Sequence, residues 1–241
     1  DLEHHPEVLD GAQLYLSLGH DEYWSAGMRD TVAAFIGRGG NAAFFSGNTS
    51  LWQVRIEGDD HDVRVGYKGF FKDDPVLGTD REPEVTTFWS DVLVGRPENL
   101  MTGVSFTRGG YHRIGRNVSS GLGGYTVHRA DHWIFEGTGL GYGDVLGVDA
   151  TVVGYECDGC ELTWKDGLPV PTHRDGTPET FTVLSSCPVR WHPDDAEWYE
   201  RWEKGRTGNA VIGTYTRGGT VVTVGSTDWA HGLRGNDAAV V

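Results

Sequence analysis

Two short apolar runs with a helical pattern between them are the clearest structural signal in the chain. Residues 14–18 are apolar apart from one serine, which predicts a buried strand. Between 23 and 38 the apolar positions recur at the spacing of one helix face, and two glycines follow. A second buried run covers 42–46. A strand–helix–strand unit of about 35 residues suits one right-handed crossover between parallel strands.

The pattern after this unit is less regular. Short alternating segments lie among Gly, Pro and Asp clusters, which predicts an irregular β-rich excursion at about 52–149. Buried strand patterns then return at 151–155, 181–184, 210–215 and 220–224. We therefore expect one α/β domain over residues 1–241. Its sheet would be open and mostly parallel with helices on both faces, in a layout similar to that of glutamine amidotransferases.

Polar residues follow both strands of the first unit. Residues 19–23, Gly-His-Asp-Glu-Tyr, come directly after the first strand, and Gly47-Asn48 follows the second. The carboxyl ends of neighbouring parallel strands meet at one edge, where open α/β sheets bind ligands. We therefore expect His20, Glu22 and Asn48 to lie together. A structural interpretation stays open, because acidic residues stabilise helix N-termini and Asn after Gly is a common turn residue.

Another acidic residue, Glu156, ends a predicted strand at 151–155. A carboxylate surrounded by apolar groups has a raised pKa and can act as a general base. The alternative is a turn residue that faces water.

The cysteines allow two interpretations. Cys157 and Cys160 have the spacing of half a zinc site, and a third thiol is available at Cys187. His173 or His192 would have to complete four ligands. Because a second ligand pair at matching spacing is missing, small buried thiols are the preferred interpretation.

Composition and charge narrow the classes of partner. Asp and Glu number 35 against 20 Lys and Arg, a formal charge of −15. This charge argues against nucleic acid and anionic membrane surfaces as partners. Without an apolar run of about 18 residues or a signal-peptide pattern, we expect a cytoplasmic protein. The chain starts polar and stops on apolar residues, so we expect it to be a fragment of a longer protein.

Five distinctive motifs lie at 17–25, 40–41, 45–48, 154–156 and 225–233. Together they resemble the large (beta) subunit family of N,N-dimethylformamidase, in its carboxyl-terminal domain. It implies a mononuclear Fe(3+) site bound by two tyrosines and one glutamate.

The resemblance also implies roles for individual residues. Glu22 matches the glutamate ligand, His20 and Asn48 match residues that face the substrate, and Glu156 matches the acidic base. The tyrosine ligands of the family lie upstream of His20, so we expect them upstream of this chain.

The leading hypothesis is a metal-dependent hydrolase that cleaves the C–N bond of a small amide through a metal-activated water. One alternative is a non-catalytic α/β binding or subunit module that keeps the fold without a metal. Another is a zinc enzyme that uses His20 and Glu22. Expected partners are a small amide substrate and either a second copy of the chain or a small subunit.

Overall fold

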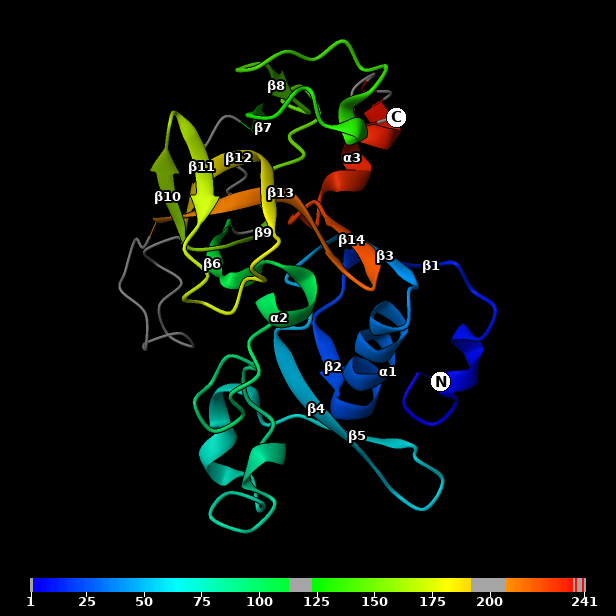
Figure 1. Cartoon of the computed structure of the whole chain (residues 1–241). Helices are drawn as coiled ribbons and strands as arrows, with labels where there is room; N and C mark the ends of the chain where they lie inside the picture. The colour runs from blue at the N-terminus through cyan, green and yellow to red at the C-terminus, as the bar shows by residue number, and fades with distance from the viewer. Residues whose placement is uncertain (1, 113–122, 192–206, 236, 238–239, 241) are drawn as a thin grey trace.

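The computed structural model describes residues 2–112, 123–191, 207–235, 237 and 240 (Figure 1). Its helices are α1 (Ala26–Gly37), α2 (Asn99–Thr102) and α3 (Trp229–Gly235), with short 3₁₀ helices at Pro6–Leu9, Lys68–Asp73, Glu82–Glu84 and Trp133–Phe135. Its strands are β1 (Leu14–His20), β2 (Tyr23–Ser25), β3 (Asn41–Gly47), β4 (Trp52–Glu57), β5 (Val63–Val65), β6 (Ser105–Tyr111), β7 (Tyr125–Val127), β8 (Val145–Leu146), β9 (Glu156–Gly159), β10 (Leu162–Lys165), β11 (Leu168–Pro171), β12 (Thr182–Arg190), β13 (Thr207–Arg217) and β14 (Gly219–Thr223).

The largest sheet is mixed and has the strand order β1-β3-β14-β13-β12-β7-β8. Strands β1, β3 and β14 pair in parallel, and all the pairs from β14 to β8 are antiparallel. Three smaller sheets, β2-β4-β5, β6-β9 and β10-β11, surround it (Figure 1). The chain is therefore rich in strands that curl into several mixed sheets.

The expected open, mostly parallel sheet with helices on both faces, as in glutamine amidotransferases, is wrong. A parallel pair needs a crossover connection of about a dozen residues or more. Between β13 and β14 the chain instead turns at Gly218, whose φ of 82° is the left-handed conformation that glycine adopts readily. The turn leaves no room for a helix, so the two strands pair in antiparallel orientation.

The predicted strand–helix–strand unit at the start of the chain is confirmed, but its first strand is not buried as expected. Leu14, Leu16 and Leu18 of β1 are 52%, 46% and 62% exposed. Strands β1 and β3 are parallel neighbours, and His20 at the end of β1 pairs with Gly47 at the end of β3. The helix between them starts later than expected. Residues 23–25 form β2 beside β4, and α1 begins at Ala26, where the Ser25 hydroxyl accepts a hydrogen bond from the Met28 backbone N–H.

Apolar side chains cover both faces of the large sheet. Val211 and Ile212 are consecutive in β13 and therefore point to opposite faces, and they belong to two separate core clusters. On the first face, Val32, Phe35 and Ile36 of α1 pack against the sheet. The two cores fix the position of β1 and β3, whose ends carry the candidate site.

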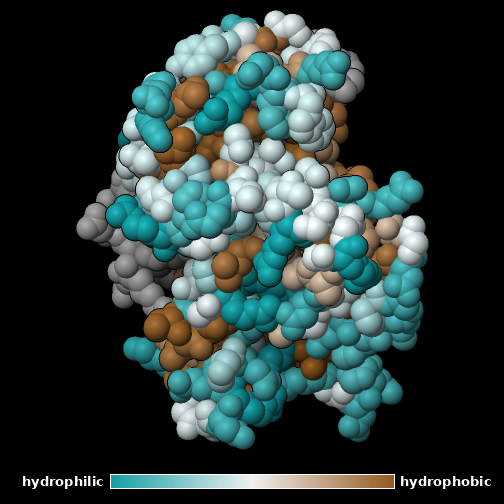
Figure 2. All heavy atoms as spheres, viewed as in Figure 1, coloured by the Kyte–Doolittle hydropathy of each residue, from teal (hydrophilic) through white to brown (hydrophobic). Residues whose placement is uncertain are grey.

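Hydrophilic side chains cover most of the face seen in Figure 2, with apolar patches between them. This surface agrees with the formal charge of −15. None of the helices in the described ranges has the length and apolar character needed to cross a membrane.

Candidate active site beside the ends of β1 and β3

A pocket of about 860 Å³ opens at the carboxyl end of β1. Its lining includes His20, Glu22 and Glu156, three of the four residues predicted from the sequence. Asn48 is only 1% exposed and contacts His20 from behind the pocket. The structure thus brings all four predicted residues together.

His20 is at the centre of this group. Its Nε2 atom lies 2.9 Å from Oε2 of Glu156 and 3.5 Å from Oε2 of Glu22. The same atom is 3.3 Å from Nδ2 of Asn48. The hydrogen-bonded Glu156 carboxylate raises the pKa of His20, and burial offsets part of this shift. The His20 imidazole, paired with this carboxylate, therefore stays protonated to a higher pH than an ordinary histidine.

Glu156 is buried at the start of β9, where β6 and the segment after β14 hold its backbone. Its N–H donates to the Thr227 hydroxyl, and its carbonyl accepts from the Thr227 N–H. Burial raises the pKa of the Glu156 carboxyl, and His20 offsets part of the rise. Its Oε2 lies 2.9 Å from Nε2 of His20, so this buried carboxylate has one close partner that can carry a proton. A buried carboxylate with a raised pKa is a candidate proton acceptor.

The loop after β3 needs a glycine and an unusual backbone conformation. A Cβ on Gly47 would lie 2.4 Å from the Thr227 nitrogen and 2.8 Å from the Glu156 carbonyl oxygen. Asn48 follows in the left-handed region with φ 52°, which Asn tolerates better than most residues. The close approach brings Asn48 next to the start of β9.

Asp158 holds this loop in place. Its two carboxylate oxygens accept the backbone N–H groups of Asn48 (2.8 Å) and Thr49 (3.0 Å). Asp158 is buried, and burial raises its pKa to about 7, although the two N–H donors lower it. Asp158 was not predicted as a site residue. Its position could have indicated it, because residues two apart in a strand share a face and Glu156 was already predicted at the site.

The two carboxylates after His20 have different contacts. Asp21 accepts hydrogen bonds from the Ser17 hydroxyl and the Trp24 indole, which indicates a structural role. Glu22 accepts a 2.7 Å hydrogen bond at Oε1 from the Trp52 indole, while its Oε2 faces His20. Glu22 therefore presents one carboxylate oxygen toward the pocket.

Aromatic and basic side chains that sequence analysis did not select form much of the remaining wall. Tyr155 lies next to Glu156, and its hydroxyl is 3.5 Å from that of Tyr111. Burial and this neighbour raise the pKa of Tyr155, so its phenol stays neutral. Lys68 lines the pocket from an irregular segment, where no periodic pattern could place it.

The described residues do not fit a metal centre by themselves. Nowhere in the described ranges are three or more His, Cys, Asp or Glu side chains placed to hold an ion. Oxygen donors suitable for ferric iron are present at Glu22 and Glu156, but Trp52 and His20 already contact them.

The described cysteines do not support the zinc interpretation. Cys157, Cys160 and Cys187 are buried, and none belongs to a group placed to hold an ion within the described ranges. His192, the other histidine considered as a zinc ligand, lies outside the described residues. Small buried thiols remain the simpler interpretation.

A search of curated proteins found no match. The family model described as "N,N-dimethylformamidase beta subunit-like, C-terminal" matches residues 1–239, which confirms the resemblance inferred from the motifs. The chain belongs to the family of N,N-dimethylformamidase beta subunit-like carboxyl-terminal domains.

Proposed function

We propose that the pocket beside β1 and β3 hydrolyses the C–N bond of an amide. The observation that supports it best is Glu156, a buried carboxylate with a raised pKa whose Oε2 lies 2.9 Å from His20 in a pocket. Buried titratable groups with shifted pKa values cluster at functional sites. Membership in a family described as dimethylformamidase-like agrees with this reaction class.

In the proposed reaction, Glu156 accepts a proton from water as the water oxygen adds to the amide carbonyl carbon. The carboxyl then returns that proton to the nitrogen as the C–N bond breaks, which yields a carboxylic acid and an amine. A positioned general base of this kind contributes about 10²–10⁴-fold to the rate.

His20 and Asn48 support this step. The His20 side chain is 44% exposed and, when protonated, supplies a donor for negative charge on the carbonyl oxygen. Asn48 is buried behind the ring, with its side-chain amide 3.3 Å from Nε2, and supports the ring by packing. The Asp158 carboxylate in turn holds the Asn48 backbone.

The ferric ion that the family resemblance implies is a separate part of the proposal. Glu22 would contribute one carboxylate, and the other ligands would come from outside the described residues. Metal analysis of the purified protein tests this part, with visible tyrosinate absorption as the signature of ferric iron. Iron content that does not fall in Glu22→Ala would overturn the ligand assignment.

Amine release from a panel of amides that includes N,N-dimethylformamide tests the proposed reaction. We expect Glu156→Gln to lose about 10²–10⁴-fold in turnover. The control is Glu179→Gln, because this residue has an 87% exposed side chain outside the pocket. Equal turnover in both variants would overturn the role of Glu156. Ligand binding without turnover in the unmodified protein would favour the non-catalytic alternative.

A further inference from the structure

One stretch of the pocket wall, residues 68–72, is rich in lysine. The chain has only four lysines, and two of them, Lys68 and Lys72, line this pocket. In a chain with a formal charge of −15, these two ammonium groups balance the charge of the two carboxylates that line the same cavity, Glu22 and Glu156. The proposed amide chemistry at Glu156 does not use either of them.

Aromatic rings and a phenol hold the Lys68 ammonium in place. Its Nζ lies 5.0 Å from the centre of the Tyr23 ring and 5.1 Å from that of the Trp52 ring. It also donates a 2.7 Å hydrogen bond to the Tyr23 hydroxyl. Cation–π contacts of this kind fix an ammonium group without neutralising its charge.

The backbone of Lys68 is also held in an uncommon conformation. Its φ is 57°, the left-handed region that side-chain-bearing residues rarely adopt, and its N–H donates to the Thr86 carbonyl. Such conformations cost about 1–3 kcal/mol and persist where the surrounding structure enforces them, often at ligand sites. The fold therefore keeps Lys68 at the pocket.

Lys68 has no carboxylate partner within 4.0 Å in the part of the chain that the structure describes. Several arginines of the chain do pair with acids, as Arg81 does with Glu84 and Arg96 with Asp30. An ordered ammonium with no paired acid, at the edge of a cavity, can bind an anionic ligand group.

The size of the pocket leaves space for such a group. Ligand sites for drug-sized molecules measure about 300–1,000 Å³, and this cavity has about 860 Å³. A dialkylformamide would fill a small part of it.

We infer that the substrate is an amide that also carries a carboxylate, which Lys68 binds while the amide group faces Glu156. Lys72, exposed at the same wall, adds positive charge that attracts the anion. This inference rests on the proposed amide hydrolysis for the orientation of the substrate, but the preference for an anion does not depend on turnover.

Calorimetric binding to matched probes tests the inference. The probes are N-acetylglycine and 4-acetamidobutanoate, each compared with its neutral carboxamide. We expect the better carboxylate to bind about tenfold more tightly than its carboxamide, and Lys68→Met to remove this preference. Lys68→Arg should keep it. Lys165→Met is the matched control, since Lys165 is exposed in β10 and does not line the pocket.

Three results would overturn the inference: equal affinity for the charged and neutral probes, no measurable binding of either carboxylate, or a preference that survives in Lys68→Met. The third result includes an equal loss of affinity for both probes, because Lys68 would then act only through the shape of the pocket. Amine release is measured separately. A Lys68-dependent carboxylate preference without amine release would contradict the proposed reaction alone, and hydrolysis of neutral amides without the preference would contradict this inference alone.

Discussion

Asp74 and Glu156 are both buried carboxylates in contact with one cationic side chain, but their surroundings differ. Asp74 accepts hydrogen bonds from Arg55 Nη1 at 2.8 Å and from both the backbone N–H and the hydroxyl of Thr86. Burial alone would raise its pKa, but these donors lower it to about 2. At Glu156 burial prevails and the pKa rises.

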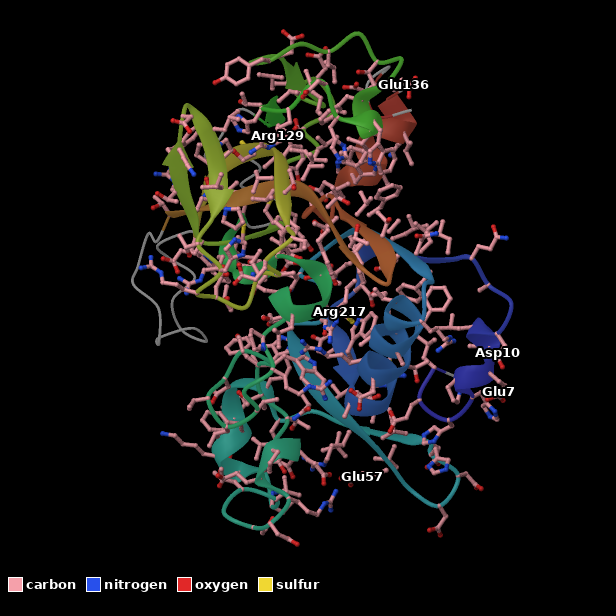
Figure 3. The ribbon with its side chains drawn as sticks, in the orientation of Figure 1. Glu7, Asp10, Glu57, Arg129, Glu136 and Arg217 are labelled. Atoms are coloured by element: carbon pink, nitrogen blue, oxygen red, sulfur yellow. The ribbon has the colours of Figure 1, made fainter. Side chains whose placement is uncertain are left out.

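The comparison shows how the same chemical group serves structure in one place and chemistry in another. A carboxylate surrounded by aligned donors stays charged, and it holds chain segments together. Arg55 extends this network to Glu57, which Figure 3 labels at the end of β4. A buried carboxylate whose pKa is raised and whose close partner is a histidine can exchange a proton.

Replacing the two carboxylates by amides should separate these roles most clearly. We expect Glu156→Gln to lower the rate of amide hydrolysis by about 10²–10⁴-fold. Its free energy of unfolding should change by less than about 1 kcal/mol, because Gln resembles the protonated carboxyl that burial favours. Steady-state kinetics and urea unfolding of the same preparations check both numbers. A large loss of stability in this variant would place Glu156 with Asp74 as a structural residue.

For Asp74→Asn we expect a large fall in the free energy of unfolding, in contrast to Glu156→Gln. The substitution leaves the buried Arg55 guanidinium without its main acid, and breaking such a pair costs about 3–5 kcal/mol. Urea unfolding against the unmodified protein measures the difference. A change below about 1 kcal/mol would mean that Glu57 compensates for the missing charge.

Acid unfolding should depend on Asp74 with a defined sign. Because its folded pKa is about 2 against an ordinary 3.8, the charged form stabilises the fold above pH 4. As the pH falls from about 4 to about 2, the protein should lose about 2 kcal/mol from this group. In Asp74→Asn this part of the pH dependence should be missing. Chemical unfolding at a series of pH values tests it.

The smallest effect is expected from Thr86→Val. The Thr86 hydroxyl donates to Asp74 and accepts from the Tyr67 N–H, so its loss removes one buried and one partly buried hydrogen bond but keeps the Arg55 pair. We expect the free energy of unfolding to fall by about 1–3 kcal/mol. Thr163→Val, at an exposed position of β10, is the control and should have little effect. An equal result for both variants would contradict this view of the Asp74 network.

Local patterns predicted the first unit of the fold and half of the site. The apolar runs and the helical spacing of 14–46 define β1, α1 and β3, and parallel pairing then brings His20 and Asn48 to one edge. The strand expected at 151–155 is wrong, because that segment is irregular and β9 begins at Glu156. The strands at 181–184, 210–215 and 220–224 were predicted, but their direction was not, because the apolar pattern of a strand does not depend on its direction. The turn at Gly218 would have indicated antiparallel pairing.

The remaining site residues depend on packing between distant segments. Asp158 could have been found from its two-residue spacing to Glu156 in one strand. Lys68 could not, because it begins a short 3₁₀ helix inside the irregular part of the chain, where no apolar pattern marks it. Tyr155 falls in a predicted strand that the structure lacks, and both residues line the pocket only through contacts between distant segments. Site residues in the irregular segments are therefore not marked by any local pattern of apolar and polar positions.

The hydrogen bond from the Asn48 N–H to Asp158 joins residues 110 positions apart in the sequence. Contacts over such separations form late in folding, because the entropy of closing a long loop must be overcome before they contribute. A partly folded chain with β1, α1 and β3 in place would therefore lack the pocket. Any ligand that binds there selects the completely folded population, and its concentration raises the free energy of global unfolding.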